Sequence, residues 1–174
     1  MISYKQFLEN KEEPTEPKKD SKIELTLYHG TYADFDEFQE NPKRMNTDYG
    51  YYGYGIYLST NPRYAKHYGS KIYKCHVTLD NPLIWEKGKE ELAEKYNITG
   101  YPKNDINAAK ELTQKIKDDG YDSVIVLGAG TGMIYGRMVE VLVFNPSKIK
   151  IINKQPDQNI EYSDFINKVT NPIQ

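Results

Sequence analysis

The chain has 174 residues and a hydrophobic fraction of 38%, which is sufficient for one domain with a single core and flanking tails. Its formal net charge of -2 excludes a protein-wide basic field of the kind that attracts nucleic acid, and its single cysteine excludes a disulfide framework and zinc sites built from cysteine pairs. No apolar run approaches the roughly 18 residues needed to span a bilayer, and the N-terminus has no signal-peptide apolar region. We therefore expect a soluble, cytoplasmic protein without a membrane partner, and we take it to be monomeric.

The chain begins with a segment that differs from the rest. A charged, proline-bearing run cannot bury enough apolar surface to offset the entropy cost of ordering it, so we predict a mobile leader over residues 1–22. The next segment predicts a strand, because apolar residues and a terminal histidine alternate on one face: Ile23, Leu25, Leu27 and His29. A polar loop from Tyr32 to Asp48 follows.

The stretch from Gly50 to Gly69 organises the rest of the chain. A loop of tyrosines and glycines leads into a short predicted strand, Ile56–Ser59. A short helix follows, for which Asn61 is the expected N-cap, Pro62 the first helical residue and Gly69 the stop.

Two tyrosines of this stretch indicate a ligand. Tyr57 lies on the predicted strand and Tyr68 closes the last turn of the helix. A strand and the helix after it can place two rings a few ångströms apart. Because the faces of phenol rings are negative, such a pair suits a flat, electron-poor ligand.

The second half of the chain mixes strands and helices without regular alternation, which argues against a doubly wound parallel sheet and favours a mostly antiparallel α+β fold. Its predicted helices cover Glu90–Tyr96 and Asp105–Asp119, and its predicted strands cover Lys71–Leu79, Leu83–Trp85, Tyr121–Leu127, Val139–Phe144 and Lys148–Ile152. We expect one domain over residues 23–152 and a polar tail over residues 153–174.

Glu140 and His29 are the first candidates for chemistry. Glu140 lies in a predicted strand that is apolar on both faces, where a carboxylate is costly unless it has a partner or faces a cavity. A solvated edge strand is the alternative. His29 ends an apolar strand face, and a satisfied core histidine is the alternative there.

Other sites receive less support. Three histidines without ligand spacing make a metal site unfavoured. The glycine-rich segment Gly128–Gly136 has Met133 in place of the third glycine of a dinucleotide fingerprint, and no helix follows, so we interpret it as a flexible loop.

Three segments together resemble a known family: Tyr28–Thr31 (YHGT), Gly55–Ser59 (GIYLS) and Glu140–Phe144 (EVLVF). In this order they are similar to the His-Tyr-Glu signature of ADP-ribosyltransferases of the diphtheria-toxin and poly(ADP-ribose) polymerase type. Tyr68 has the spacing from Tyr57 of that family's second stacking tyrosine. The Asn81–Leu83 frame and the ending Phe144–Lys150 look closer to a branch found in polyvalent proteins of phages and mobile elements, and the resemblance covers roughly residues 24–150.

The resemblance implies a split β-sandwich of two small antiparallel sheets with flanking helices, with NAD in the cleft between the sheets and no metal. It also implies contacts to the two sugars. His29, helped by Thr31, would bond the adenine-side ribose, and Glu140 would bond the 2′-hydroxyl of the nicotinamide-side ribose.

At the nicotinamide end, the resemblance implies that Tyr57 and Tyr68 sandwich the ring and that the backbone of Gly30 holds the carboxamide. Ala65 stands where much of the family has a carboxamide-binding serine, so that contact is lost or supplied elsewhere, for instance by Ser59.

Three further positions concern the pyrophosphate and the acceptor. Arg44 and its neighbour Lys43 could meet the pyrophosphate, with solvated surface charge as the alternative. The arginine-modifying branch has Glu or Gln where Met138 stands, and an Arg rather than a His on its first strand, so arginine is disfavoured as an acceptor.

The leading hypothesis is therefore a mono-ADP-ribosyltransferase that moves ADP-ribose from NAD to a host protein or nucleic acid and releases nicotinamide. Glu140, His29 and Tyr57 would be its catalytic residues. Two alternatives stay open: a non-catalytic module that binds NAD or ADP-ribose, and an NAD-dependent RNA 2′-phosphotransferase.

Overall fold

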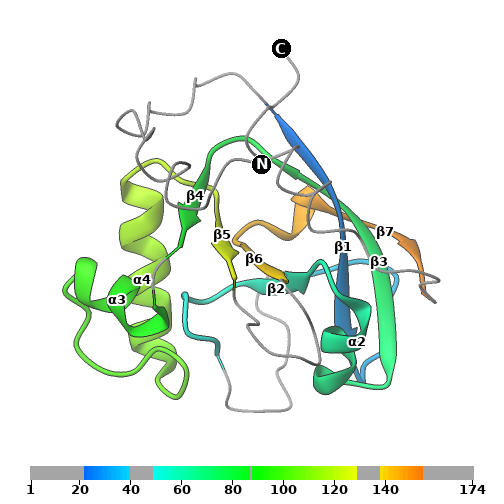
Figure 1. Cartoon of the computed structure of the whole chain (residues 1–174), viewed down its shortest axis with the longest axis horizontal. Helices are drawn as coiled ribbons and strands as arrows, with labels where there is room; N and C mark the ends of the chain where they lie inside the picture. The colour runs from blue at the N-terminus through cyan, green and yellow to red at the C-terminus, as the bar shows by residue number, and fades with distance from the viewer. Residues whose placement is uncertain (1–21, 40–48, 87, 129–137, 155–174) are drawn as a thin grey trace, which may run out of the picture.

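The computed structural model describes residues 22–39, 49–86, 88–128 and 138–154. Within these ranges, seven strands form one sheet in the order β4-β5-β6-β2-β1-β3-β7 (Figure 1). Every neighbouring pair is antiparallel except β4 and β5. The strands are β1 (Ile23–Thr31), β2 (Ile56–Ser59), β3 (Lys71–Leu79), β4 (Pro82–Trp85), β5 (Ser123–Leu127), β6 (Val139–Val143) and β7 (Ile149–Asn153).

In the part of the chain that the structure describes, the helices are few and short, as the sequence predicts for an α+β fold. They are α2 (Pro62–Ala65), α3 (Lys89–Lys95) and α4 (Ile106–Asp118), with 3-10 turns η1 (Lys66–Tyr68) and η2 (Pro146–Lys148). Asp105 caps α4, because its carboxylate accepts from the backbone amides of Asn107 and Ala108.

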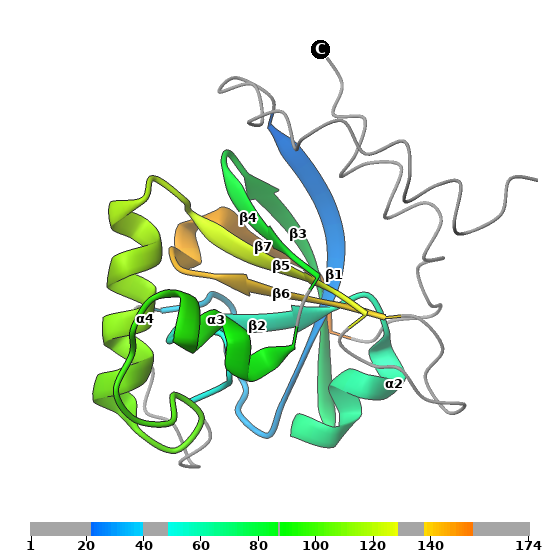
Figure 2. The ribbon, with the colours of Figure 1, turned by 60° about the vertical axis from the view of Figure 1, so that its left-hand side comes forward.

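The expectation of two separate small sheets is not confirmed, because hydrogen bonds run through all seven strands. The register joins β1 to β2 at Tyr28 and Ser59. On either side of this junction lie two halves, β4-β5-β6-β2 and β1-β3-β7, which cross steeply in Figure 2. The main core lies between the halves, so that Leu27 and Val77 of one pack with Leu58 and Val141 of the other. A sandwich-like core is thus built from a single sheet that folds across its narrow junction.

A second core covers the opposite face of the β4-β5-β6-β2 half. Leu92 of α3 and Leu112 of α4 pack there against Val124 and Leu142. The two helices lie on the same side of the molecule in Figure 1. They cover this face only in part, which leaves the end of the sheet near α2 for other side chains.

Several sequence predictions fall on residues outside the described ranges. These are the leader, the pair Lys43 and Arg44, most of the Gly128–Gly136 loop, and the tail beyond Lys154. Among the described residues, no helix is long and apolar enough to cross a membrane.

Candidate active site

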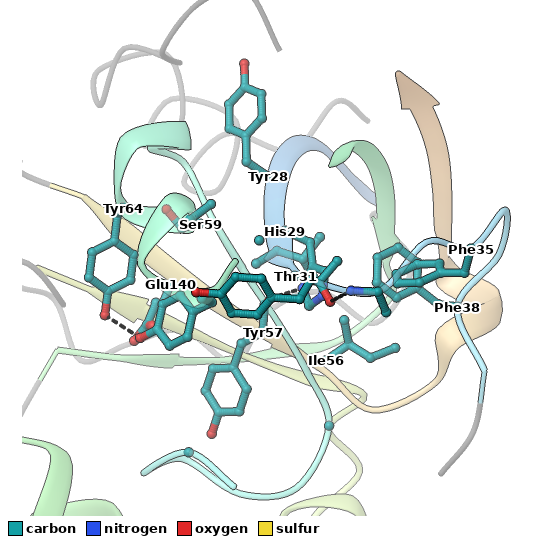
Figure 3. Close-up of a pocket in the computed structure, with 18 of the residues that line it drawn as sticks. Tyr28, His29, Thr31, Phe35, Phe38, Ile56, Tyr57, Ser59, Tyr64 and Glu140 are labelled. Carbon is teal, nitrogen blue, oxygen red and sulfur yellow. Dashed lines mark hydrogen bonds between the residues drawn. The ribbon is translucent and has the colours of Figure 1, made fainter. Parts of the chain in front are cut away.

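A cavity of about 750 Å³ opens where β1 and β2 separate beyond their junction. Three neighbouring strands each contribute one polar candidate to its lining: His29 from β1, Tyr57 from β2 and Glu140 from β6 (Figure 3). His29 and Glu140, the first and last of these residues, are 111 positions apart in the sequence. Strand order alone therefore assembles them.

The register aligns the carboxylate with the tyrosine. Ser59 pairs directly with Glu140, and Tyr57 pairs with Leu142, the next residue of β6 on the same face. Ile56 and Leu58 alternate to the opposite face and join the main core. Tyr57 and Glu140 consequently share one face of the sheet, diagonal to each other.

His29 bridges the gap where the two strands part. Its Nδ1 lies 2.8 Å from the carbonyl oxygen of Tyr57, so Nδ1 carries the proton and donates. In the neutral ring, Nε2 is then an acceptor. Phe38 packs edge-on against the imidazole, with ring centroids 5.1 Å apart. His29 is thus fixed in orientation at the wall of the cavity.

The ring of Tyr57 is held at its far end. Its hydroxyl donates to the carbonyl of Gly53 at 2.8 Å and accepts from the amide of Tyr52 at 3.0 Å. Gly50 has φ of +84°, and a Cβ there would lie 2.2 Å from the Tyr57 ring. The tyrosine and glycine loop therefore holds the hydroxyl, while Tyr57 still lines the cavity.

Helix α2 and turn η1 pack onto the end of β1 through two close approaches. A Cβ on Gly30 would lie 1.7 Å from the carbonyl oxygen of Ala65, and one on Gly69 would lie 2.0 Å from the backbone of Thr31. Both glycines are needed for this packing, which sets Ala65 against the cavity wall.

Glu140 is half-buried, and its charge acts on tyrosines around it. Burial, followed by the negative charge of Glu140, raises the pKa of Tyr52 and the pKa of Tyr64 above the usual range. Both phenols therefore stay protonated. An ionised carboxylate in such a partly desolvated place can stabilise positive charge that develops beside it.

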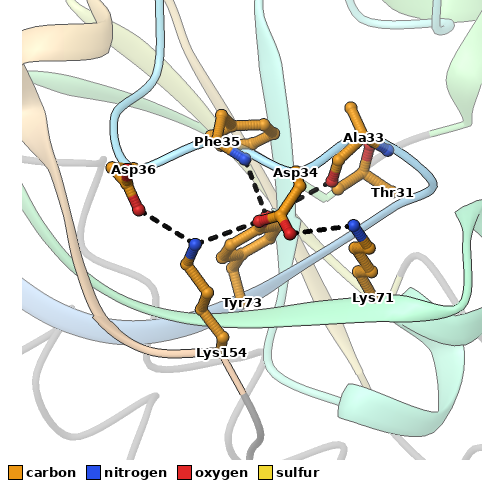
Figure 4. A network of polar contacts seen from close by, with 8 residues as sticks. All are labelled: Thr31, Ala33, Asp34, Phe35, Asp36, Lys71, Tyr73 and Lys154. Atoms are coloured by element: carbon orange, nitrogen blue, oxygen red, sulfur yellow. Dashed lines mark hydrogen bonds and ion pairs between the residues drawn. The ribbon is translucent and has the colours of Figure 1, made fainter.

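The loop after β1 forms another wall of the cavity and is tied down from behind (Figure 4). Lys154 lies 3.0 Å from Asp34 and 2.9 Å from Asp36, and Lys71 lies 3.0 Å from the other oxygen of Asp34. The hydroxyl of Tyr73 accepts from the amide of Phe35 at 3.1 Å. These contacts hold the loop that carries the cavity-lining phenylalanines.

Replacing Lys154 by alanine should loosen this loop. We expect the Phe35 amide to exchange hydrogen several-fold faster, with little change in melting temperature because exposed ion pairs contribute little to stability. Hydrogen exchange measured by NMR checks this. Lys150→Ala, at an exposed position of β7, the strand that Lys154 follows, is the matched control, and equal exchange in both variants would contradict the account.

The same network has a defined pH dependence. Lys154 and Lys71 hold the pKa of the Asp34 carboxyl well below its ordinary value of 3.8. Since the folded pKa is the lowered one, the contribution to stability is present above pH 3.8 and is lost as the pH falls through the folded pKa. The ion pairs of Asp34 should therefore hold the loop in place throughout the neutral pH range.

Comparison with known proteins bears on this cavity. A family model described as the ADP-ribosyltransferase in polyvalent proteins matches residues 23–158. The chain belongs to this family. No curated protein matches the sequence. Among solved structures, the crystal structure of an anti-CRISPR protein is similar over 80% of this chain and 100% of that one, with 17% identity and a TM-score of 0.41. Likeness of that degree leaves function open.

ADP-ribosyltransferases use NAD as substrate, and the matched region contains the whole described cavity. All of the sequence-predicted ligand residues except Arg44 line it: His29, Gly30, Thr31, Tyr57, Ser59, Ala65, Tyr68 and Glu140. Arg44 lies outside the described residues. Among the side chains that the structure describes, no three of His, Cys, Asp or Glu gather as a metal site.

Two of these residues differ in setting from the rest. Ser59 is buried, and its hydroxyl donates to the carbonyl of Asn61 at 3.0 Å and accepts from the amide of Asn61 at 2.9 Å. That hydroxyl is committed to the turn before α2. Tyr68 is 45% exposed and stands at the mouth of the cavity.

Sequence reasoning missed Tyr64. It lines the cavity beside Glu140, and its hydroxyl lies 2.9 Å from that of Tyr68. The signal was present, because residues four apart on a helix are neighbours and Tyr64 precedes Tyr68 by four. The resemblance to the ADP-ribosyltransferase signature indicates roles for Tyr57 and Tyr68, but not for Tyr64.

Gly50→Ala gives a further prediction for this member of the ADP-ribosyltransferase family. The new methyl group would overlap the Tyr57 ring, and alanine is strained at a φ of +84°. We expect NAD affinity, measured by calorimetry, to fall several-fold. Gly120→Ala is the control, because its φ of +90° imposes the same strain while no atom lies within 4 Å. Equal loss of affinity in both variants would contradict a specific effect on Tyr57.

Proposed function

We propose that this protein is an NAD-dependent mono-ADP-ribosyltransferase whose reaction takes place in the cavity between β1, β2 and β6. One observation carries the proposal: His29, Tyr57 and Glu140 line a single cavity from three adjacent strands. Family membership supports the reaction class, and the cavity supports the assignment of residues.

In the proposed reaction, the bond between C1′ of the ribose and the nicotinamide nitrogen breaks. The bonding electrons leave with nicotinamide, which becomes neutral, and the sugar becomes an oxocarbenium-like cation. The carboxylate of Glu140, bonded to the 2′-hydroxyl, stabilises that cation. A nucleophile of the acceptor then adds at C1′ and gives up its proton.

The other residues bind and orient NAD. The ring face of Tyr57 supports the nicotinamide ring, with Tyr68 closing over it from the mouth. The acceptor nitrogen of His29 and the hydroxyl of Thr31 meet the adenine-side ribose, and the backbone of Gly30 meets the carboxamide. Because the hydroxyl of Ser59 is committed to Asn61, we assign Ser59 to the scaffold rather than to the carboxamide.

The acceptor is a macromolecule of the cell in which the protein acts, and a contact of Arg44 with the pyrophosphate stays part of the proposal. Mass spectrometry of a lysate incubated with isotope-labelled NAD and this protein would identify the acceptor. A label on one class of side chain or base, as single units, is the expected result.

Incubation with NAD alone and with possible acceptors tests the reaction class. Nicotinamide release that requires Glu140 supports the proposal. Binding without release would overturn it in favour of a binding module, an alternative that Ala65 leaves open because it lacks the hydroxyl of the family's serine. Release only with 2′-phosphorylated RNA would indicate a phosphotransferase.

A further inference from the structure

Tyr64 touches both groups that the proposed reaction depends on. Its hydroxyl lies 2.9 Å from the hydroxyl of Tyr68, and the two rings meet edge to face with centroids 5.5 Å apart. Tyr64 and Glu140 line the same cavity, and the charge and hydrogen bonding of the Glu140 carboxylate raise the pKa of the Tyr64 hydroxyl. Figure 3 shows the Tyr64 side chain reaching from α2 toward Glu140. One side chain thus joins the carboxylate to the tyrosine at the mouth of the cavity.

The direction of these two hydrogen bonds follows from the acceptors. A phenol has one proton, and an ionised carboxylate is a stronger acceptor than a second phenol. Tyr64 therefore donates to Glu140 and accepts from Tyr68. Burial, the charge of Glu140 and the hydrogen bond that Tyr64 donates to it raise the pKa of Tyr64, so it remains a donor and cannot serve as a general base near neutral pH.

The backbone of Tyr64 is fixed relative to Glu140 by a closed chain of contacts. Ser59 pairs with Glu140 across β2 and β6, and the Ser59 hydroxyl holds the backbone of Asn61. The side chain of Asn61 then accepts from the amides of Arg63 at 2.8 Å and Tyr64 at 3.3 Å. Because the backbone of Tyr64 is held in this way, its hydroxyl can contact the carboxylate of Glu140 at little cost in conformational entropy.

We propose that Tyr64 is a positioning residue that holds the carboxylate of Glu140 toward the ribose and couples its orientation to Tyr68. The inference rests on the proposed function and deepens it. Tyr64 acts on the reaction through Glu140, so its effect should appear in the rate of bond cleavage more than in NAD affinity.

The test compares Tyr64→Phe with wild type for nicotinamide release. The variant keeps the ring and loses one hydrogen bond to a charged group, for which we expect roughly a 10-fold lower kcat with KM changed less than about twofold. Tyr96→Phe is the matched control, because the Tyr96 hydroxyl also donates to a carboxylate, that of Asp119 at 2.9 Å, outside the cavity lining. Equal kcat values in Tyr64→Phe and Tyr96→Phe would overturn the inference.

A double-mutant cycle tests the route of the effect. If Tyr64 acts through Glu140, adding Tyr64→Phe to Glu140→Gln should lower kcat by much less than 10-fold, since the ionised partner is already gone. A full, additive loss in the double variant would instead indicate a general disturbance of the cavity.

A titration that needs no activity separates the two proposals. With carbon-13 at glutamate carboxyl groups and Glu140 assigned through Glu140→Gln, its NMR titration midpoint should rise by about one pH unit in Tyr64→Phe, because a donor to the charged form is lost. The other titratable groups that line the cavity are the same in both proteins: His29, Asp34, Glu37, Lys103, and the tyrosines Tyr28, Tyr32, Tyr51, Tyr52, Tyr57 and Tyr68. An unchanged titration midpoint of Glu140 in Tyr64→Phe would contradict the inference. A wild-type protein that binds NAD but releases no nicotinamide would contradict the proposed function.

Discussion

Replacing Glu140 by glutamine should lower the rate of nicotinamide release from NAD by about 100-fold, because removing one charge-stabilising group of this kind typically costs that much. NAD binding should change far less. Glutamine has the same shape and can still accept from Tyr64, and NAD itself carries no oxocarbenium charge before the bond breaks. Single-turnover release of nicotinamide, together with calorimetric binding of NAD, measures both quantities.

The control for this variant is Glu24→Gln. Glu24 is an exposed residue of β1 and is not among the cavity-lining side chains. Its replacement changes the net charge equally and should leave the release rate unaltered. A Glu140→Gln enzyme as fast as wild type would show that the carboxylate does not stabilise the transition state.

Replacing Tyr57 by alanine should weaken NAD binding by about 10- to 100-fold. Stacking on an aromatic side chain contributes about 1–3 kcal/mol for each base in nucleic-acid complexes, and the nicotinamide ring is cationic, which favours a phenol face further. The expected loss appears as a higher KM, because the stacking ring already binds NAD in the ground state.

Tyr57→Phe distinguishes stacking from the anchoring of the loop. Phenylalanine keeps the ring and loses the two hydrogen bonds at the hydroxyl, to Gly53 and from Tyr52. We expect its KM to rise only a few-fold. Thermal unfolding should accompany both measurements, because Tyr57 also packs against the second core. Equal KM values in the Phe and Ala variants would locate the contribution in the hydroxyl and contradict a stacking role.

Much of the local structure could be predicted because it is encoded in neighbouring residues. Alternation from Ile23 predicts β1, and the Asn61–Pro62 pair predicts where α2 begins. The structure confirms both, with the Asn61 side chain accepting from the first amides of the helix. The last two residues of β1 were missed because Gly30 interrupts the alternation, although its backbone pairs with Ile72.

The arrangement of the sheet could not be predicted in the same way. Whether seven strands form one sheet or two depends on the single junction of Tyr28 with Ser59, and no periodicity in the sequence specifies a pairing over that separation. The adjacency of β6, β2 and β1, which assembles the cavity, is likewise a long-range property. Only the family signature indicated that His29, Tyr57 and Glu140 would meet.

The limits at the site have a chemical cause. Sequence identifies residue types, whereas hydrogen-bond partners depend on where each side chain reaches. Ser59 has the right group to bind a carboxamide, yet its hydroxyl is committed to Asn61. Tyr64 appeared as one of 16 tyrosines and gained significance only through its contacts with Glu140 and Tyr68.

The most direct measurement is a crystal structure of the Glu140→Gln protein with NAD, in which slow cleavage should preserve the intact molecule. The account predicts the nicotinamide ring against the face of Tyr57 and the adjoining ribose beside residue 140, with the adenine-side ribose at His29. Intact NAD bound anywhere else on the protein, with this cavity empty, would contradict it.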